Sequence, residues 1–216
     1  FNYCDFSQFS RHLIMEREML EAFSKHADQD CVVVDVGAFN GLYGFIAAGK
    51  GAESFLFEIS NQPFQRLLDT AEENPDLDFK IERKAVWSSN GVVEAPESGT
   101  GQSQVGEGSV KVPSVTLDSY FEDREDLDVI KIDVEGAEGP VLEGATRVLE
   151  ESTPDIFIEL HDDGRIEEFG GSREQIEDLL KTHGYEKKFE RDRGSETHQV
   201  WKEKIPPAFR EGGKYA

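Results

Sequence analysis

The fold is decided by residues 31–41, which read CVVVDVGAFNG. Residues 31–36 form a short β-branched run ended by glycine, as expected for a parallel strand buried on both faces. Glycines at 37 and 41 let the backbone turn sharply and approach a ligand closely. The apolar residues 42–49 then predict a short helix, whose N-terminus offers unpaired N–H donors. This stretch predicts a strand, a tight turn and a helix, the start of a βαβ unit.

Outward from this segment, predicted strands and helices alternate along the chain. Further strands are expected at 54–58, 79–86, 129–133 and 155–160, and helices at 5–26, from Pro63 onward, over 140–149 and from Ser172 to Gly184. This alternation predicts a parallel sheet with right-handed crossovers. Two last strands, 185–190 and 197–202, are joined by the turn 191–194, which requires at least one antiparallel strand.

The length of 216 residues predicts one domain. We expect a helical cap over 1–30, a core over 31–205 and a tail over 206–216. The segment 94–111 is rich in Gly and Ser and nearly free of apolar residues, so it is expected to be a flexible connection or a flap that closes over substrate.

The composition is strongly acidic, with 45 acidic and 23 basic side chains and a net charge of −22. Such a field repels phosphate backbones and anionic membranes, so neither nucleic acid nor a membrane is an expected partner. The acids are spread along the chain, which favours a salt-adapted, halophilic protein over an ordinary acidic one. Two cysteines cannot build a disulfide framework or a Cys-based zinc site, and no signal segment or membrane span is recognised, which predicts a soluble, cytoplasmic protein.

The first candidate site combines the turn after residue 36 with Glu58, which ends the next strand 21 residues after Gly37. A carboxylate there can accept hydrogen bonds from both hydroxyls of a ribose. The Gly-x-Gly-x-x-Gly pattern of pyrophosphate-binding folds is absent because position 39 is Phe. The pattern favours a nucleoside ligand without pyrophosphate; the simpler alternative is an ordinary turn and a surface glutamate.

The second candidate site lies at the end of the strand 129–133, where Lys131, Asp133, Glu135 and Glu138 are close in sequence. Charges on a strand buried on both faces need an explanation, because an unpaired buried charge is very costly. Lys131 and Asp133 share a strand face, so they either form a mutual pair or serve the site. His161, at the end of the next strand, is either a general base or a solvated loop histidine.

These residues resemble a known family. The string 33–41 is similar to motif I of class I S-adenosylmethionine-dependent methyltransferases, and residues 115–119, 130–138 and 142–145 resemble the signature of the FkbM family. Ile59 and Phe39 depart from residues that are common in that family. The resemblance implies an α/β, Rossmann-like, doubly wound sheet of seven strands, mostly parallel, with an antiparallel C-terminal strand.

The resemblance also implies S-adenosylmethionine as cofactor and O-methylation of a hydroxyl on a sugar or another natural product. The methionine part would lie on Asp35, Gly37, Ala38, Asn40 and Gly41, the ribose on Glu58, and the adenine near Ala85, Val86 and Trp87. Asp133 would lie near the sulfonium.

The general base is left open among Asp133, Glu135 and His161. No metal is expected; the disfavoured alternative is that the carboxylate cluster holds Mg²⁺, which prefers oxygen ligands. The expected partner is a hydroxylated small molecule. The alternatives are a cofactor-binding interaction module without catalysis and, disfavoured by Phe39, an NAD-dependent dehydrogenase.

Overall fold

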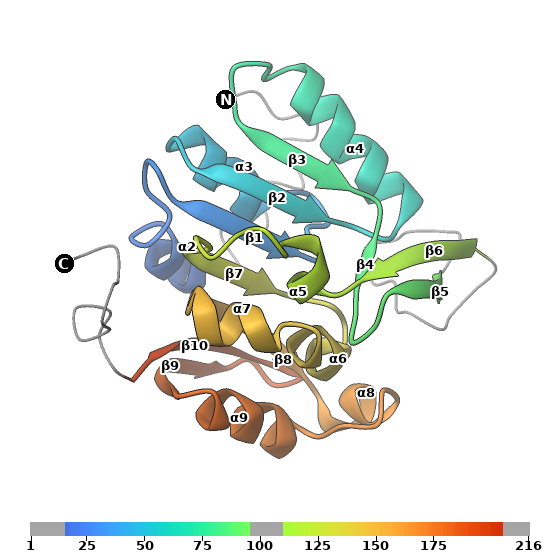
Figure 1. Ribbon diagram of the computed structural model, residues 1–216, viewed down its shortest axis with the longest axis vertical. Helices are drawn as coiled ribbons and strands as arrows, with labels where there is room; N and C mark the ends of the chain where they lie inside the picture. The colour runs from blue at the N-terminus through green and yellow to red at the C-terminus, as the bar shows by residue number, and fades with distance from the viewer. Residues whose placement is uncertain (1–15, 96–109, 205–216) are drawn as a thin grey trace.

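A computed structural model describes residues 16–95 and 110–204 (Figure 1). Its main sheet has seven strands in the order β3-β2-β1-β7-β8-β10-β9. The strands are β1 (Val32–Val36), β2 (Glu53–Phe57), β3 (Phe79–Glu82), β7 (Val129–Ile132), β8 (Asp155–His161), β9 (Tyr185–Asp192) and β10 (Glu196–Glu203). Only β10 runs against its neighbours, β8 and β9. The predicted seven-stranded, mostly parallel sheet with an antiparallel C-terminal strand is confirmed.

Helices cover both faces of this sheet, so the fold is doubly wound (Figure 1). One face packs against α2 (Arg17–Phe23), α3 (Leu42–Gly49) and α4 (Asn61–Glu72), and the other against α5 (Leu117–Tyr120), α6 (Glu138–Glu143), α7 (Thr146–Glu151), α8 (Asp163–Glu167) and α9 (Arg173–Thr182). Side chains alternate between the two faces along β1. Val32, Val34 and Val36 pack against the helices α5 to α9, and Val33 packs on the face covered by α2 and α3. Asp35 and Lys131, which belong to the candidate site described below, lie on the same face of the sheet as Val33.

The predicted helices are largely confirmed, with one correction. Residues 140–149 were expected to form one helix, but the helix breaks between α6 and α7 at Gly144. At Gly144 the backbone passes so close to the Trp87 carbonyl that a Cβ would overlap it. Asp118 then caps the second helix, because its carboxylate accepts hydrogen bonds from the backbone of Arg147 (3.0 Å) and Val148 (2.9 Å). Only residues 17–23 of the predicted helix 5–26 are observed as α2, and its first part lies outside the described residues.

The predicted strand 79–86 is also wrong as a single strand. Its first half is β3, at the edge of the main sheet, but Ala85–Val86 form β4 in a second sheet of order β4-β6-β5. β2 ends at Phe57, opposite Glu82, so the chain has no partner beyond it in the main sheet. β6 (Val110–Val115) provides the new partner, pairing Ser114 and Val115 with residues 85 and 86.

The predicted loop 94–111 therefore begins and ends in strands, since β5 (Gly91–Ala95) pairs with β6 in an antiparallel register. The rest of that segment, where a flap was predicted, lies outside the described residues. The small sheet stands beside the carboxyl ends of β1, β2 and β7 (Figure 1). The division into 1–30, 31–205 and 206–216 stays a prediction.

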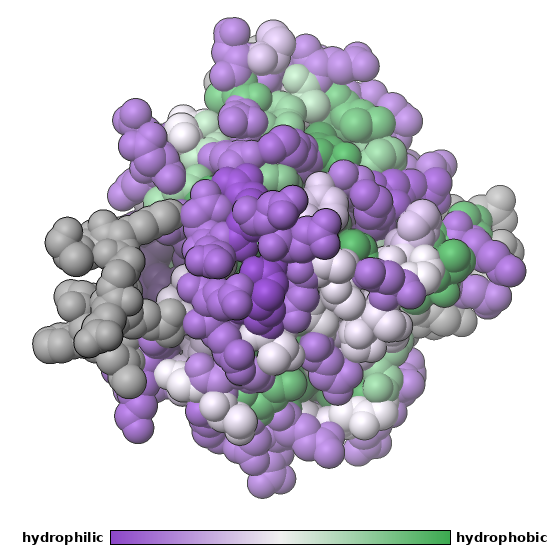
Figure 2. All heavy atoms as spheres, in the orientation of Figure 1, coloured by the Kyte–Doolittle hydropathy of each residue, from purple (hydrophilic) through white to green (hydrophobic). Residues whose placement is uncertain are grey.

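Hydrophilic side chains cover much of the face shown in Figure 2. Within the described ranges no helix combines the length and apolar character needed to cross a membrane.

Candidate active site

The turn after β1 is held against the ends of two neighbouring strands. The backbone N–H groups of Gly37 and Ala38 both donate to the carbonyl of Phe57, at 3.0 and 2.9 Å. Gly37 has a φ of +78°, and a Cβ at this position would overlap the carbonyl oxygen of Asp133. Only glycine fits here, because any other side chain would meet backbone and would be strained at positive φ. The turn is therefore packed between the carboxyl ends of β1, β2 and β7.

Asp35 lies beneath this turn rather than on its open side. Its side chain is almost fully buried and accepts a hydrogen bond of 3.0 Å from the backbone N–H of Gly44 in α3. Burial raises the pKa of Asp35 to about 6, while the charge of Lys131 and the Gly44 hydrogen bond act in the opposite direction. The carboxylate thus fixes the start of α3 under the turn. Asn40 is also buried, and its side-chain oxygen accepts from the Leu42 N–H at 3.2 Å.

Glu58, at the end of β2, is brought to the same turn, as the sequence predicted. Glu58 is 6% exposed, and its carboxylate accepts hydrogen bonds from the backbone N–H groups of Phe39 (2.8 Å) and Ser60 (2.6 Å). Burial raises the pKa of Glu58, and these backbone hydrogen bonds lower it. Each carboxylate oxygen has further acceptor capacity. A surface glutamate, the simpler alternative, does not describe this buried and oriented side chain.

Ala85, Val86 and Trp87 come from the second sheet and its following turn. Ala85 and Val86 are buried, and the half-buried ring of Trp87 packs edge-to-face on Phe169, with centroids 5.7 Å apart. Phe169 follows α8, so this contact joins the small sheet to the segment after β8.

Lys131 and Asp133 form the mutual pair that the sequence left open. Lys131 is fully buried, its ammonium lies 3.6 Å from Asp133 Oδ2, and it also lies over the ring of Tyr43, 5.1 Å from the centroid. The Asp133 side chain is 37% exposed. Lys131 is therefore a buried structural partner, whereas the Asp133 side chain is partly exposed and the Asp133 backbone carbonyl lies against Gly37.

His161 is held between two carboxylates and is not a solvated loop histidine. Its Nδ1 lies 2.8 Å from Oε1 of the fully buried Glu138, and its Nε2 lies 3.3 Å from Oε2 of Glu135. Arg165 also pairs with Glu135. Burial acts to lower the pKa of His161, but the hydrogen bond with Glu138 and the charge of Asp133 outweigh it and raise the pKa to about 9. His161 is therefore a cation near neutral pH.

This protonation links stability to pH. The pKa of His161 rises from 6.5 to about 9 on folding, so its contribution is complete below about pH 6.5 and is lost as the pH rises through about 9. We expect the wild-type free energy of unfolding to fall between these pH values by on the order of 1–3 kcal/mol more than that of His161→Gln. Urea unfolding measures this difference. His183→Gln, in the turn after α9, is the control, and an identical pH dependence in wild type and His161→Gln would contradict the assignment.

A second group of buried polar residues was missed by sequence reasoning. Register places His198 of β10 opposite Glu159 of β8, with His198 Nε2 2.7 Å from the carboxylate, and Glu16 lies 3.5 Å from the same nitrogen. Burial is the main cause of both pKa shifts, raising that of Glu159 and lowering that of His198. Both directions favour uncharged forms of this pair.

Two groups in this region have ligand atoms within 4.8 Å of one another, as a cation site requires: Asp133, Glu159 and His161, and Glu16, Glu159 and His198. Lys131 already supplies positive charge to Asp133 and Glu159.

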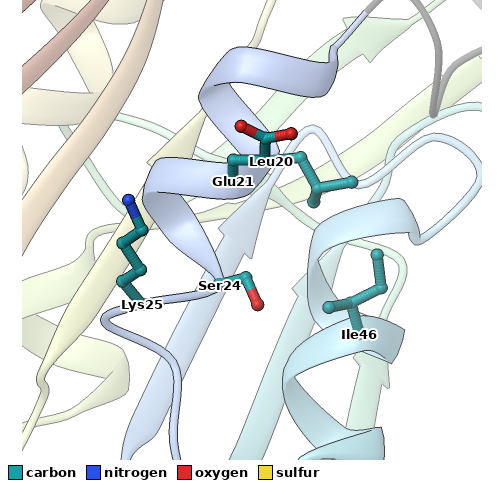
Figure 3. A pocket seen from close by; sticks show the side chains of 5 residues that line it. All are labelled: Leu20, Glu21, Ser24, Lys25 and Ile46. Carbon is teal, nitrogen blue, oxygen red and sulfur yellow. The ribbon is translucent and has the colours of Figure 1, made fainter.

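A hollow elsewhere, between α2 and α3, is lined by Leu20, Glu21, Ser24, Lys25 and Ile46 and contains none of the predicted site residues (Figure 3).

Solved structures share this fold. The methyltransferase FkbM of Methylobacillus flagellatus KT superposes with a TM-score of 0.57 at 13% identity, covering 88% of this chain and 60% of that one. A protein of Streptococcus pneumoniae, solved in complex with S-adenosyl-L-methionine, gives 0.54 at 13% identity, covering 86% and 72%. The fold is thus that of the Rossmann-like methyltransferases.

The family follows from sequence comparison. The family described as "Methyltransferase FkbM domain" matches residues 26–187, and this chain belongs to that family. The hexuronic acid methyltransferase AglP of Haloferax volcanii is 31% identical over 157 residues. The match covers 70% of this chain and 64% of that relative, so the chain spans somewhat less than two thirds of the relative's length.

Proposed function

We propose that this protein transfers a methyl group from S-adenosylmethionine to a hydroxyl of a hexuronic acid or a related acidic sugar. One observation carries the proposal: in a chain of the FkbM family, the Gly37 turn and the buried Glu58 meet at one carboxyl edge, beside Asp133. The similarity to a hexuronic acid methyltransferase supports the acceptor class.

The residues at this edge fit the cofactor. The turn carries no side chain at Gly37, since a Cβ there would overlap the Asp133 carbonyl, and Glu58 is oriented by two N–H groups with acceptor capacity left for ribose hydroxyls. Ala38, Asn40 and Gly41 would line the methionine part, Asp35 would support it from below, and Ala85, Val86 and Trp87 would lie along the adenine. When bound, the sulfonium supplies the methyl group with a good leaving group already attached.

The role of the protein is then mainly alignment. In the proposed transfer the acceptor oxygen would bond to the methyl carbon as the carbon–sulfur bond broke, and the hydroxyl proton would pass to a base of the protein. Holding the reactants in line is worth ~7–11 kcal/mol, whereas a general base adds about 10²–10⁴-fold. Losing alignment should therefore cost more than losing the base.

Asp133 is the base that the geometry supports best. His161 carries a proton near neutral pH, and Glu135 is engaged by Arg165 and His161. Asp133 has one ion-pair partner, Lys131 at 3.6 Å, and its side chain is 37% exposed against 18% for Glu135, while its backbone carbonyl lies against the Gly37 turn. No step requires a metal, and we expect activity to survive EDTA.

A methyl-release assay and calorimetry test the function together. The purified protein should bind S-adenosylhomocysteine and convert glucuronate to a methylated product. Tight cofactor binding without turnover of any hydroxylated acceptor would favour the non-catalytic module, and binding of NAD(H) instead would favour the dehydrogenase. The hydroxylated acceptor, the lack of a nucleic-acid or membrane partner, and the cytoplasmic location stay predictions.

The acidic composition supports a salt-adapted protein, and the relative from Haloferax volcanii comes from a halophile. Self-repulsion at a net charge of −22 should be screened as the Debye length shortens from ~10 Å at 0.1 M salt to ~3 Å at 1 M. We expect the Tm to rise steadily over this range of KCl, as measured by circular dichroism. A flat Tm would contradict the halophilic assignment.

A further inference from the structure

An acidic sugar needs a cation at the site, because a protein of net charge −22 otherwise repels it. Two cations near the site are already occupied. Lys131 is buried under Tyr43 and paired with Asp133. Arg173 is used to hold the chain, since its guanidinium donates to the carbonyls of Leu160, His161 and Ser195 and to the hydroxyl of Thr197.

Arg165 is different, because it lies at the site and is only partly used. It belongs to α8, directly after β8, and its side chain is 34% exposed. Its Nη1 pairs with Glu135, and its Nε lies 3.9 Å from Asp162. Within the described ranges, Nη2 makes no hydrogen bond to the protein.

The backbone holds Arg165 in place over the loop after β7. Gly136, at a φ of +108°, packs so closely on α8 that a Cβ would lie 2.7 Å from the Arg165 carbonyl oxygen. The preceding residue, Glu135, also has a positive φ, of +56°. The loop and the helix therefore form one packed unit, and the guanidinium keeps its place relative to the strand ends.

Arg165 already pairs with one carboxylate, that of Glu135. Its carboxylate lies between Arg165 and the Nε2 of His161, 3.3 Å away, so a carboxylate is already accommodated here. His161 also lies near Asp133, since a ring nitrogen of His161 and a carboxylate oxygen of Asp133 are within 4.8 Å of each other. The contacts therefore run from Arg165 through Glu135 and His161 to Asp133, which places the guanidinium and the proposed base in one connected polar cluster.

We propose that Arg165 binds the carboxylate of the acceptor through its remaining N–H donors and thereby selects acidic over neutral sugars. This inference rests on the proposed function. A guanidinium offers a planar pair of donors that matches a carboxylate, which a lysine ammonium does not reproduce. A neutral sugar would leave those donors without a charged partner, so Arg165 is a specificity-determining residue and not a catalytic one.

The test compares glucuronate with its neutral methyl ester, which keeps the same ring and hydroxyls. In Arg165→Gln we expect KM for glucuronate to rise about 10- to 100-fold and KM for the ester to change less than about threefold. Arg165→Lys should recover part of the selectivity. Arg191→Gln, which removes an exposed arginine paired with Glu18 away from the site, should leave both KM values unchanged.

Two further measurements separate this inference from the proposed function. The affinity for S-adenosylhomocysteine should stay unchanged in Arg165→Gln, which shows that the variant is folded. Binding of glucuronate to the S-adenosylhomocysteine complex, followed by NMR, should weaken in this variant even without turnover. An equal loss for acid and ester, or no loss for either, would overturn the role of Arg165, as would a wild type that methylates only neutral sugars. A wild type that methylates no acceptor would instead count against the proposed function.

Discussion

Replacing Glu58 by alanine is expected to weaken the binding of S-adenosylhomocysteine by at least about 100-fold, or about 2.7 kcal/mol. Two losses add up. The ribose hydroxyls lose a charged acceptor, and hydrogen bonds to charged groups contribute ~1.5–3 kcal/mol each. The turn also loses its brace, because Phe39 and Ser60 no longer have an acceptor for their N–H groups. Isothermal titration calorimetry measures the effect directly.

Two variants make this result specific. Glu58→Gln keeps the size of the side chain and one acceptor oxygen, so its affinity should fall between wild type and Glu58→Ala. Glu72→Ala, on the exposed side of α4, removes a glutamate away from the turn and should change nothing. If Glu58→Ala unfolds at the wild-type temperature and binds with wild-type affinity, the placement of the ribose is wrong.

The first half of this site could be predicted because its determinants are local. A β-branched run, a glycine and an apolar helix follow one another within residues 31–49, and β1 and α3 form where these patterns place them. Parallel strands bring their carboxyl ends to one edge, so Glu58 necessarily approaches the turn once β1 and β2 pair. The spacing between Gly37 and Glu58 was therefore informative without knowledge of distant contacts.

The small sheet could not be predicted in the same way. β5 and β6 are short, flank a Gly- and Ser-rich segment, and include Pro113, which is unfavourable in a central strand. β4 has only two residues and exists because β6 lies beside it. The break at Gly144 has the same origin, since it depends on the Trp87 carbonyl on this sheet. These features follow from non-local pairing rather than from periodicity.

The role of Glu159 and His198 needed the register of β10 on β8, which the sequence does not specify. A signal was nevertheless present. Lys131 and Asp133 are two positions apart at the end of β7, and Glu159 and His161 are two positions apart in β8. Because side chains alternate along a strand, all four lie on the same face as Val33. Polar residues repeating every second position in two adjacent buried strands indicate a connected polar row, and a further polar residue on the next strand is then expected.

Replacing Asp133 by asparagine is expected to lower kcat by about 100-fold or more, with the affinity for S-adenosylhomocysteine changed less than about threefold. The expected loss corresponds to the ~10²–10⁴-fold contribution of a positioned general base. Asparagine preserves the size of the side chain and the backbone carbonyl that faces Gly37, so the turn should remain intact. Single-turnover methyl transfer separates this chemical effect from product release.

The pH profile decides whether Asp133 or His161 is the base. A rate that is nearly constant from pH 6.5 to 8 is expected if His161 is not the base, because His161, with a pKa of about 9, stays protonated over this range. If His161 is the base, the rate should instead rise about tenfold per pH unit towards pH 9, and His161→Gln should lose that rise. Glu135→Gln serves as the matched carboxylate control, because Glu135 is engaged by Arg165 and His161 and its loss should reduce kcat less than the loss of Asp133. A larger effect in Glu135→Gln, at equal cofactor affinity, would move the role of base to that residue.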